Sequence, residues 1–254
     1  MNITGNTILL TGGSSGIGRG LTEALLALDN KVITADRRPG TLKDLQQKYP
    51  GLSSTFLDAN DPGSIRAVAK LIVQDHPELN VLINNAGISR IENLKELPAS
   101  LADSEAVITT NLLGPIRLTA ALLPHLQSRP NAAIINVTSG LAFVPFVHAP
   151  TYCATKAALH SYTVSLRVAL AGTPVEVIEI IPPAVATNLT PGRKPDERYI
   201  STEEFIAESM QQLKAKPTPT EVTVGRANFL RTAEATGNYE KALAMLSAFQ
   251  LPKE

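Results

Sequence analysis

Cysteine and aromatic residues are scarce in this chain. The few aromatic residues indicate an aliphatic core, and the cysteine content indicates the redox compartment. Cys153 is the one cysteine among 254 residues, so no internal disulfide can form and a reducing compartment is expected. Residues 1–6 lack the charged and apolar regions of a signal peptide, and no apolar run approaches the roughly 18 residues of a membrane span. We therefore expect a cytoplasmic protein, with Cys153 serving helix packing.

An excess of charge of either sign is also absent. Lysine and arginine total 23, as do aspartate and glutamate, and no basic stripe is evident. Binding to nucleic acid or to a membrane is therefore not expected. No metal site is expected either, because the histidines show no metal-ligand spacing. They are His76, His125, His148 and His160.

Short apolar runs alternate with helical patterns through most of the chain. The first strand, helix and strand are expected at 7–11, 17–28 and 31–35, which is a βαβ unit with parallel strands. Further strands are expected at 53–57, 81–84, 133–137 and 175–181, and helices at 62–74, about 103–128 and about 152–171. We predict an α/β fold, a doubly wound and mostly parallel Rossmann-type sheet, in a single domain of residues 1–254.

The tail has a different pattern. Residues 187–202 contain prolines, a glycine and several charges, which indicates a mobile substrate loop. Two helices, at 202–214 and 227–250, are expected on either side of a last strand at 221–224.

The first turn carries glycines spaced G-x-x-x-G-x-G after the first strand. Gly12 permits a tight turn, while Gly16 and Gly18 allow close approach of a cofactor and the helix. The positive end of that helix would face the pyrophosphate of a dinucleotide. The predicted cofactor contacts here are Gly12, Ser14, Ser15, Gly16, Ile17 and Gly18.

Asp36 ends the second strand, where a carboxylate would accept hydrogen bonds from the adenosine ribose and repel a 2′-phosphate. Arg37 and Arg38 follow, and a guanidinium can instead hold that phosphate. A fixed carboxylate is harder to displace than a mobile arginine. NAD(H) is therefore favoured, with NADP(H) as the alternative.

Tyr152 and Lys156 lie four residues apart on a predicted helix, so their side chains share one face. A phenol alone titrates near ~10. A nearby ammonium stabilises the phenolate and lowers its pKa toward the working range. The pair is our candidate acid/base, although the same spacing also occurs in surface packing.

Five motifs occur in the order and spacing of the short-chain dehydrogenase/reductase family. They are residues 11–18, Asn84-Asn85-Ala86-Gly87, Asn111, Ser139 and Tyr152-x-x-x-Lys156. The chain resembles that family over roughly residues 5–190, and residues 111–126 and 140–162 resemble bacterial oxidoreductases of the D-alanyl-lipoteichoic-acid operon type.

The resemblance implies a role for each motif residue. Ser139 would hydrogen-bond the substrate oxygen, Tyr152 would exchange its proton, and Lys156 would lower the tyrosine pKa and hold the nicotinamide ribose. Asn111 would interrupt its helix and hold a water that links Lys156 to solvent. Pro183 departs from the pattern, since the family usually has glycine there. The other implied cofactor contacts are Asp58, Ala59, Asn85, Ala86, Gly87, Val185 and Thr187.

We therefore expect an NAD(P)-dependent oxidoreductase that transfers a hydride between a nicotinamide and a small-molecule carbonyl or alcohol, without a metal. A dinucleotide-sensing regulatory protein without turnover is one alternative, but it would not need Ser139, Tyr152 and Lys156. A sugar-nucleotide epimerase or dehydratase is another, and it would need a larger substrate lobe than the short stretch after Val185.

Apolar residues near the predicted site indicate an apolar substrate, with ordinary core packing as the alternative. They are Leu141, Phe143, Val144, Phe146, Val147 and Leu189. The helices at 103–128 and 152–171 carry more apolar positions than one sheet-facing stripe needs, so a homodimer or homotetramer is expected. Those positions are Leu112, Leu113, Ile116, Leu118, Leu122, Leu159, Val164, Leu166 and Val168.

Overall fold

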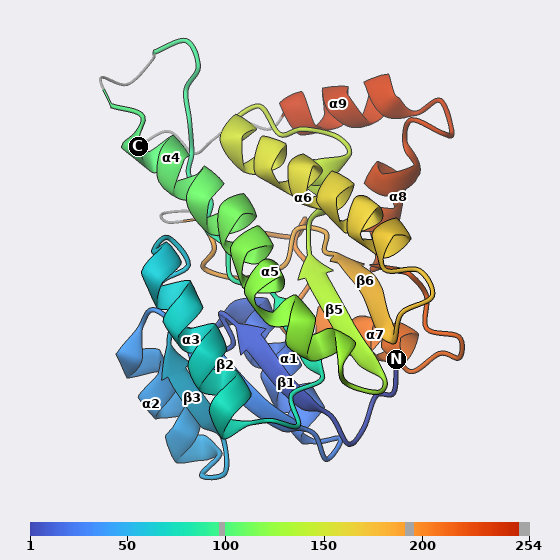
Figure 1. The fold of residues 1–254 in the computed structure, drawn as a ribbon. Helices are drawn as coiled ribbons and strands as arrows, with labels where there is room; N and C mark the ends of the chain where they lie inside the picture. The colour runs from blue at the N-terminus through green and yellow to red at the C-terminus, as the bar shows by residue number, and fades with distance from the viewer. Residues whose placement is uncertain (97–99, 191–195, 249–254) are drawn as a thin grey trace.

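A seven-stranded sheet forms the centre of the computed structural model, which describes residues 1–96, 100–190 and 196–248 (Figure 1). The strand order is β3-β2-β1-β4-β5-β6-β7, and all six pairings are parallel. The strands are β1 (Thr7–Thr11), β2 (Lys31–Asp36), β3 (Ser53–Phe56), β4 (Val81–Asn84), β5 (Ala132–Val137), β6 (Val175–Ile181) and β7 (Glu221–Thr223). The predicted doubly wound α/β fold is confirmed.

Helices cover both faces of the sheet, so β1, β4 and β5 are buried at every position. One face packs against α1 (Gly16–Leu26), α2 (Pro39–Lys48) and α7 (Thr202–Leu213). The other packs against α3 (Pro62–Asp75), α5 (Gly114–Gln127) and α6 (Pro150–Ala169). Two-sided burial explains why these strands are continuous apolar runs rather than alternating ones.

The order of strands places a switch point between β1 and β4. The chain moves outward from β1 to β3, then returns to β4 and continues toward the opposite edge. Connections leave β1 and β4 in opposite directions, so a crevice opens at their carboxyl ends, where ligands bind in sheets of this type.

Most predicted elements match the observed ones within two residues, and three differ. Helix α2 was not predicted. The stretch expected as one helix at 103–128 is α4 (Ala102–Ile108), a π-helical turn at Thr109–Leu113, and α5. The stretch at 227–250 is two helices, α8 (Ala227–Thr232) and α9 (Tyr239–Ser247), with Gly237 in the left-handed region between them (φ 68°). Residues 191–195 and 249–250 of the predicted tail lie outside the described residues.

Within the described residues, one helical stretch, Ala102–Gln127, is long and apolar enough to cross a membrane by length and composition alone. No such run was expected from the sequence. Its side chains Val107, Leu118, Leu122 and Leu126 are buried inside the protein. That burial is typical of the core helix of a globular fold.

Candidate active site

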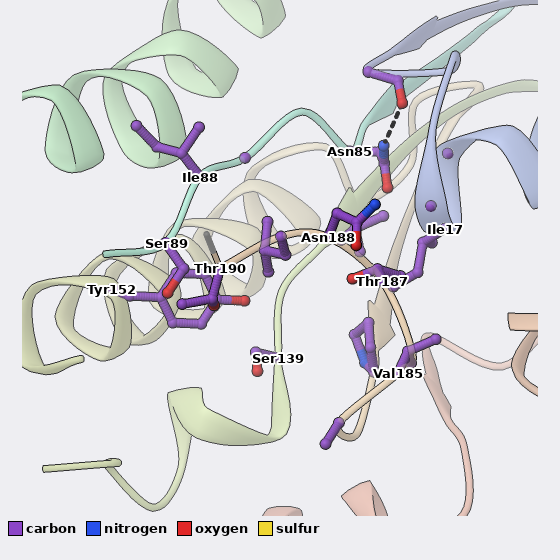
Figure 2. Close-up of a pocket in the computed structure, with 18 of the residues that line it drawn as sticks. Ile17, Asn85, Ile88, Ser89, Ser139, Tyr152, Val185, Thr187, Asn188 and Thr190 are labelled. Atoms are coloured by element: carbon purple, nitrogen blue, oxygen red, sulfur yellow. Dashed lines mark hydrogen bonds between the residues drawn. The ribbon is translucent and has the colours of Figure 1, made fainter. Parts of the chain in front are cut away.

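A cavity of 1270 Å³ opens over the carboxyl ends of the strands. In Figure 2, Tyr152 and Ser139 lie on one side of it, and Ile17, Val185 and Thr187 lie on the other. It brings together most of the residues predicted for cofactor and substrate. These are Gly12, Ser15, Gly16, Ile17, Gly18, Asp36, Arg37, Asp58, Ala59, Asn85, Ala86, Gly87, Ser139, Tyr152, Lys156, Val185 and Thr187. Ser14 and Asn111 are not among its lining residues.

The glycine turn has the geometry that a bound pyrophosphate requires. Gly12 and Gly16 adopt left-handed conformations, with φ of 68° and 51°. A Cβ on Gly18 would lie 2.0 Å from the Gly12 carbonyl oxygen, so only glycine lets α1 start this close to the turn. Ser15 leaves the start of α1 without a side-chain cap. The N–H groups and positive dipole of that helix end therefore fit an anion in the cavity.

At the far end of the same crevice, Asp36 is held in place from two sides. Its carboxylate accepts hydrogen bonds from the Ser14 hydroxyl and from the backbone N–H of Arg38 (3.1 Å). Ser14 is not among the residues that line the cavity, so its contact with the cofactor stays a prediction. The Arg38 guanidinium donates to Ser15 Oγ (2.6 Å) and has its Nε 3.6 Å from Asp36. Arg38 thus bridges Asp36 and the glycine turn, while Arg37 lines the cavity.

Three buried side chains form the opposite end. Ser139 follows β5 and begins a short 3₁₀ turn, where its hydroxyl accepts the N–H of Leu141 (3.1 Å). Tyr152 and Lys156 lie one turn apart on α6 and are 8% and 4% exposed. Lys156 Nζ donates to the carbonyl of Val137 (2.8 Å) and lies 5.7 Å from the centroid of the Tyr152 ring.

Burial dominates the proton affinities of this pair. It raises the pKa of Tyr152 to about 12, although a hydrogen bond with Ser139 acts in the opposite direction. Burial lowers the pKa of Lys156 to about 8, and the negative charge of Glu179 opposes that shift. The sequence predicted a lowered tyrosine pKa, and the shift has the opposite sign because desolvation disfavours the phenolate. Tyr152 in this setting is a protonated donor.

Asn111 sits in the π-helical turn between α4 and α5, so the predicted local interruption of the helix is confirmed. Its side chain bonds both backbone groups of Ile88, at 2.9 and 2.8 Å, and donates to Thr155 (3.3 Å). It therefore ties the segment after β4 to α6 from behind the cavity wall. A Cβ on Gly87 would lie 3.3 Å from Asn111 Oδ1, which shows how closely the two segments approach.

The apolar wall differs from the predicted one. Leu141, Phe146 and Leu189 line the cavity, whereas Phe143, Val144 and Val147 do not. Val144 packs in a cluster with α8 and α9, Phe143 lies against His160 and Arg231, and Val147 is 43% exposed. Four further apolar side chains complete what we call the substrate-side wall. They are Phe229 and Leu230 of α8 and Met245 and Leu246 of α9.

Sequence patterns could not single out these four residues. Their spacing marks one apolar helix face, which core packing also explains. Their place over the cavity depends on how the C-terminal helices fold back beside Gly140, where a Cβ would lie 3.0 Å from Leu230 Cδ1.

Comparisons with known proteins agree with this geometry. The family model described as short chain dehydrogenase matches residues 6–198. The oxidoreductase DltE of Bacillus subtilis is 40% identical over 237 residues, covering 92% of this chain and 93% of the relative. An NADP-dependent 3-hydroxy acid dehydrogenase of Schizosaccharomyces pombe is 33% identical over 223 residues, covering 83% and 86%.

A solved structure extends the likeness to the whole fold. The short chain dehydrogenase of Burkholderia cenocepacia, crystallised in complex with NADP, superposes with a TM-score of 0.81 at 27% identity. The match covers 97% of this chain and 99% of that one. The parallel sheet, the glycine turn at its switch point and these relatives lead to one conclusion: the chain belongs to the short-chain dehydrogenase/reductase family of NAD(P)-dependent oxidoreductases.

Proposed function

We propose that Ser139, Tyr152 and Lys156 carry out the reversible reduction of a carbonyl compound to an alcohol. The observation that supports this is that all three side chains line the cavity that begins at the glycine turn. When bound, the nicotinamide supplies a hydride to the carbonyl carbon or accepts one from the alcohol.

The side chains supply the proton that balances the hydride. In the direction of reduction, Ser139 hydrogen-bonds the substrate oxygen and Tyr152 Oη gives its proton to that oxygen. Lys156 carries the positive charge that stabilises the tyrosine anion left behind, until a proton from solvent replaces the one lost. Asn111 holds Ile88 and α6 in the spacing that this arrangement needs. Oxidation of an alcohol runs through the same atoms in reverse.

We propose NAD(H) as the preferred cofactor. Asp36 is 7% exposed, and its hydrogen bonds from Ser14 and Arg38 hold the carboxylate where the adenosine ribose would lie. Arg37 and Arg38 favour NADP(H) instead, because either guanidinium can bind a 2′-phosphate. The S. pombe relative is NADP-dependent by name, so the two cofactors need a direct comparison.

We further propose that the substrate has an apolar body. The seven residues of the substrate-side wall are leucine, phenylalanine and methionine. They are Leu141, Phe146, Leu189, Phe229, Leu230, Met245 and Leu246. A surface of this kind favours aliphatic or aromatic groups through burial of apolar area.

A panel of carbonyl compounds, assayed with NADH and with NADPH, tests the function. It should contain aliphatic and aromatic ketones, 3-oxo acids, dicarboxylic acids and sugar phosphates. We expect loss of the absorbance of the reduced nicotinamide with the aliphatic or aromatic members. A sensor would bind the cofactor without consuming it, and an epimerase would convert its substrate with no net consumption. A clear preference for phosphorylated or dicarboxylic compounds would contradict the apolar assignment.

A further inference from the structure

A buried acid lies behind the proposed proton-transfer site, and the reaction proposed above does not use it. Glu179, on β6, has a fully buried side chain. Its carboxylate accepts the Thr138 hydroxyl at 2.6 Å, and His160 Nδ1 lies 2.9 and 3.1 Å from its two oxygens. Burying an ionised group away from solvent costs free energy unless hydrogen bonds and an opposite charge nearby compensate for it.

Glu179 and Lys156 contact consecutive residues at the end of β5. Lys156 Nζ bonds the carbonyl of Val137, and Glu179 bonds the side chain of Thr138. Ser139 comes next in the chain. Strands β5 and β6 lie side by side beneath α6 (Figure 1), where His160 follows Lys156 by one helical turn. The acid on β6 therefore contacts both the segment that follows β5 and the helix α6, which together carry the three catalytic side chains.

Charged groups from several elements surround Glu179. From α6 it is faced by Lys156 and His160, from β7 by Glu221, and from α8 by Arg231, while Arg167 of α6 faces Glu221. Arg231 donates two bonds to Glu221, at 2.7 and 3.0 Å, and so neutralises that acid. Arg167 is bonded to the backbone carbonyls of Val177 and Thr220.

The same cluster could suggest a metal site, because ligand atoms of His160, Glu179 and Glu221 lie within 4.8 Å of one another. Its donors are already used, since Thr138 and His160 bond Glu179 and Arg231 bonds Glu221. A charge network explains the arrangement without an ion.

Lys156 needs such a counter-charge. It is almost fully buried, and its one hydrogen bond among the described residues goes to a neutral carbonyl. Burial favours the neutral amine, which would remove the charge that the tyrosine anion requires. A nearby carboxylate favours the ammonium.

We propose that Glu179, oriented by Thr138 and His160, is the counter-charge that keeps Lys156 protonated, and that it serves the reaction as a positioning residue acting through Lys156. The proposal rests on the function proposed for Tyr152 and Lys156. Its consequence has a definite sign. Without the negative charge, the pKa of Lys156 falls further below about 8, so the ammonium is lost at a lower pH. Between that lower pH and about pH 8, the tyrosine anion left by proton transfer then has no positive charge beside it.

Two variants separate the charge of Glu179 from its shape. Glu179→Gln keeps the size of the side chain and removes the charge, whereas Glu179→Asp keeps the charge and disturbs the packing. We measure kcat against pH for the full chain, with the best carbonyl compound from the panel and saturating cofactor. Glu179→Gln should move the alkaline limb of the profile to lower pH by about one unit or more. Glu179→Asp should keep the limb in place even if its melting temperature falls.

The opposite pattern would overturn the proposal. If the role of Glu179 is structural only, Glu179→Asp is the more damaging change and neither variant moves the limb. Should Glu179→Gln fail to fold, the double variant Glu179→Met/His160→Leu replaces the pair with apolar groups of similar size, which buried pairs often tolerate. It must show the same shift of the limb.

A readout without turnover separates this proposal from the proposed function. The protonation of Lys156 in each protein is followed against pH by NMR of lysine labelled with ¹³C at Cε, and the same spectrum of a Lys156→Arg counterpart is subtracted to isolate Lys156. In the Glu179→Gln background, Lys156 should lose its proton at lower pH than in the parent chain, whose Lys156 pKa burial lowers to about 8. A shift here with no turnover on any carbonyl supports the counter-charge and contradicts the function. An unshifted titration in an active enzyme contradicts the counter-charge alone.

Discussion

The phenol of Tyr152 carries the proton in the proposed reaction, and removing its oxygen is the simplest test at the scale of a residue. Tyr152→Phe keeps the ring and its packing against Phe146 and Cys153. The variant should lose at least about 100-fold in kcat, as general acid–base catalysis is worth about 10²–10⁴. The Kd of the cofactor, measured by fluorescence of the reduced nicotinamide, should stay near that of the parent chain. A near-normal kcat in this variant would contradict the role of Tyr152 as the proton donor.

Asp36 decides cofactor choice in our interpretation. We expect kcat/KM to be higher with NADH than with NADPH in the parent chain, because the carboxylate binds ribose hydroxyls and repels a phosphate. Asp36→Gly removes that repulsion and should shift the ratio toward NADPH by about tenfold, or about 1.4 kcal/mol. The Arg38 guanidinium, which then loses its pairing with Asp36, can turn to the 2′-phosphate.

The same comparison in the parent chain can contradict this interpretation. A tenfold or greater preference for NADPH before any substitution would mean that Arg37 and Arg38 outweigh the carboxylate. Arg38→Gln is the matched control, since it removes the guanidinium bridge to Ser15 and leaves Asp36. It should reduce the use of NADPH more than that of NADH.

The sequence motifs predicted which side chains line the same cavity, but not the direction of their pKa shifts or their hydrogen-bond partners. Ser139, Tyr152 and Lys156 line one cavity, as their motifs indicated. The direction of the Tyr152 pKa shift could not be predicted, because it depends on burial that arises only from tertiary packing. The partner of the Ser14 side chain could not be predicted for a related reason. A hydroxyl in a turn can face the cofactor or the next strand, and here it donates to Asp36.

At the scale of an element, the junction of β1 and α1 depends on contact too close for any side chain. Gly18→Ala places a Cβ about 2.0 Å from the Gly12 carbonyl oxygen, so the turn or the helix must move. We expect at least about a tenfold rise in the Kd of the cofactor and a loss of about 1–3 kcal/mol of stability, as for overpacked sites. Gly40→Ala in α2 is the control, because nothing lies within 4 Å of the added carbon. Unchanged cofactor affinity in Gly18→Ala would contradict this account of the turn.

Sequence periodicity located the strands well, since two-sided burial leaves continuous apolar runs between glycine and polar turns. It missed α2 because that helix is mostly polar, with Leu42 and Leu45 as its buried leucines. It merged α8 and α9 because their apolar positions resemble one long face. The break follows from the left-handed Gly237 and the turn around it, and a single glycine does not indicate a helix end by itself.

At the scale of the whole molecule, the two ends of the cavity come from different parts of the chain. The first half, from the glycine turn to the segment after β4, supplies most of the residues predicted to contact the cofactor, and Val185 and Thr187 line the cavity from the segment after β6. The second half also supplies Ser139, α6 and the substrate-side wall, four residues of which lie on α8 and α9. The first part could be predicted because its motifs are local. Leu141, Phe146 and Leu189 of the wall were predicted too. The four residues on α8 and α9 could not be, because residues more than 80 positions apart in the sequence, such as Leu141 and Leu230, meet only in the folded chain.

Helix α6 also leaves apolar side chains on the outside of the molecule. Leu118, Leu122, Leu159 and Leu166 of the predicted surplus are buried in the core. Others are left at the surface: Val168 is 73% exposed and Val164 37%. Exposed apolar positions on long helices are typical of an interface between identical subunits.

We therefore expect a dimer or tetramer by light scattering at micromolar concentration. Val168→Lys should weaken the assembly, because association would then bury a charge. Ser165→Lys, which adds the same charge at an exposed polar position of α6, is the control for a general effect of charge. A parent chain that is monomeric under these conditions would refute the assignment.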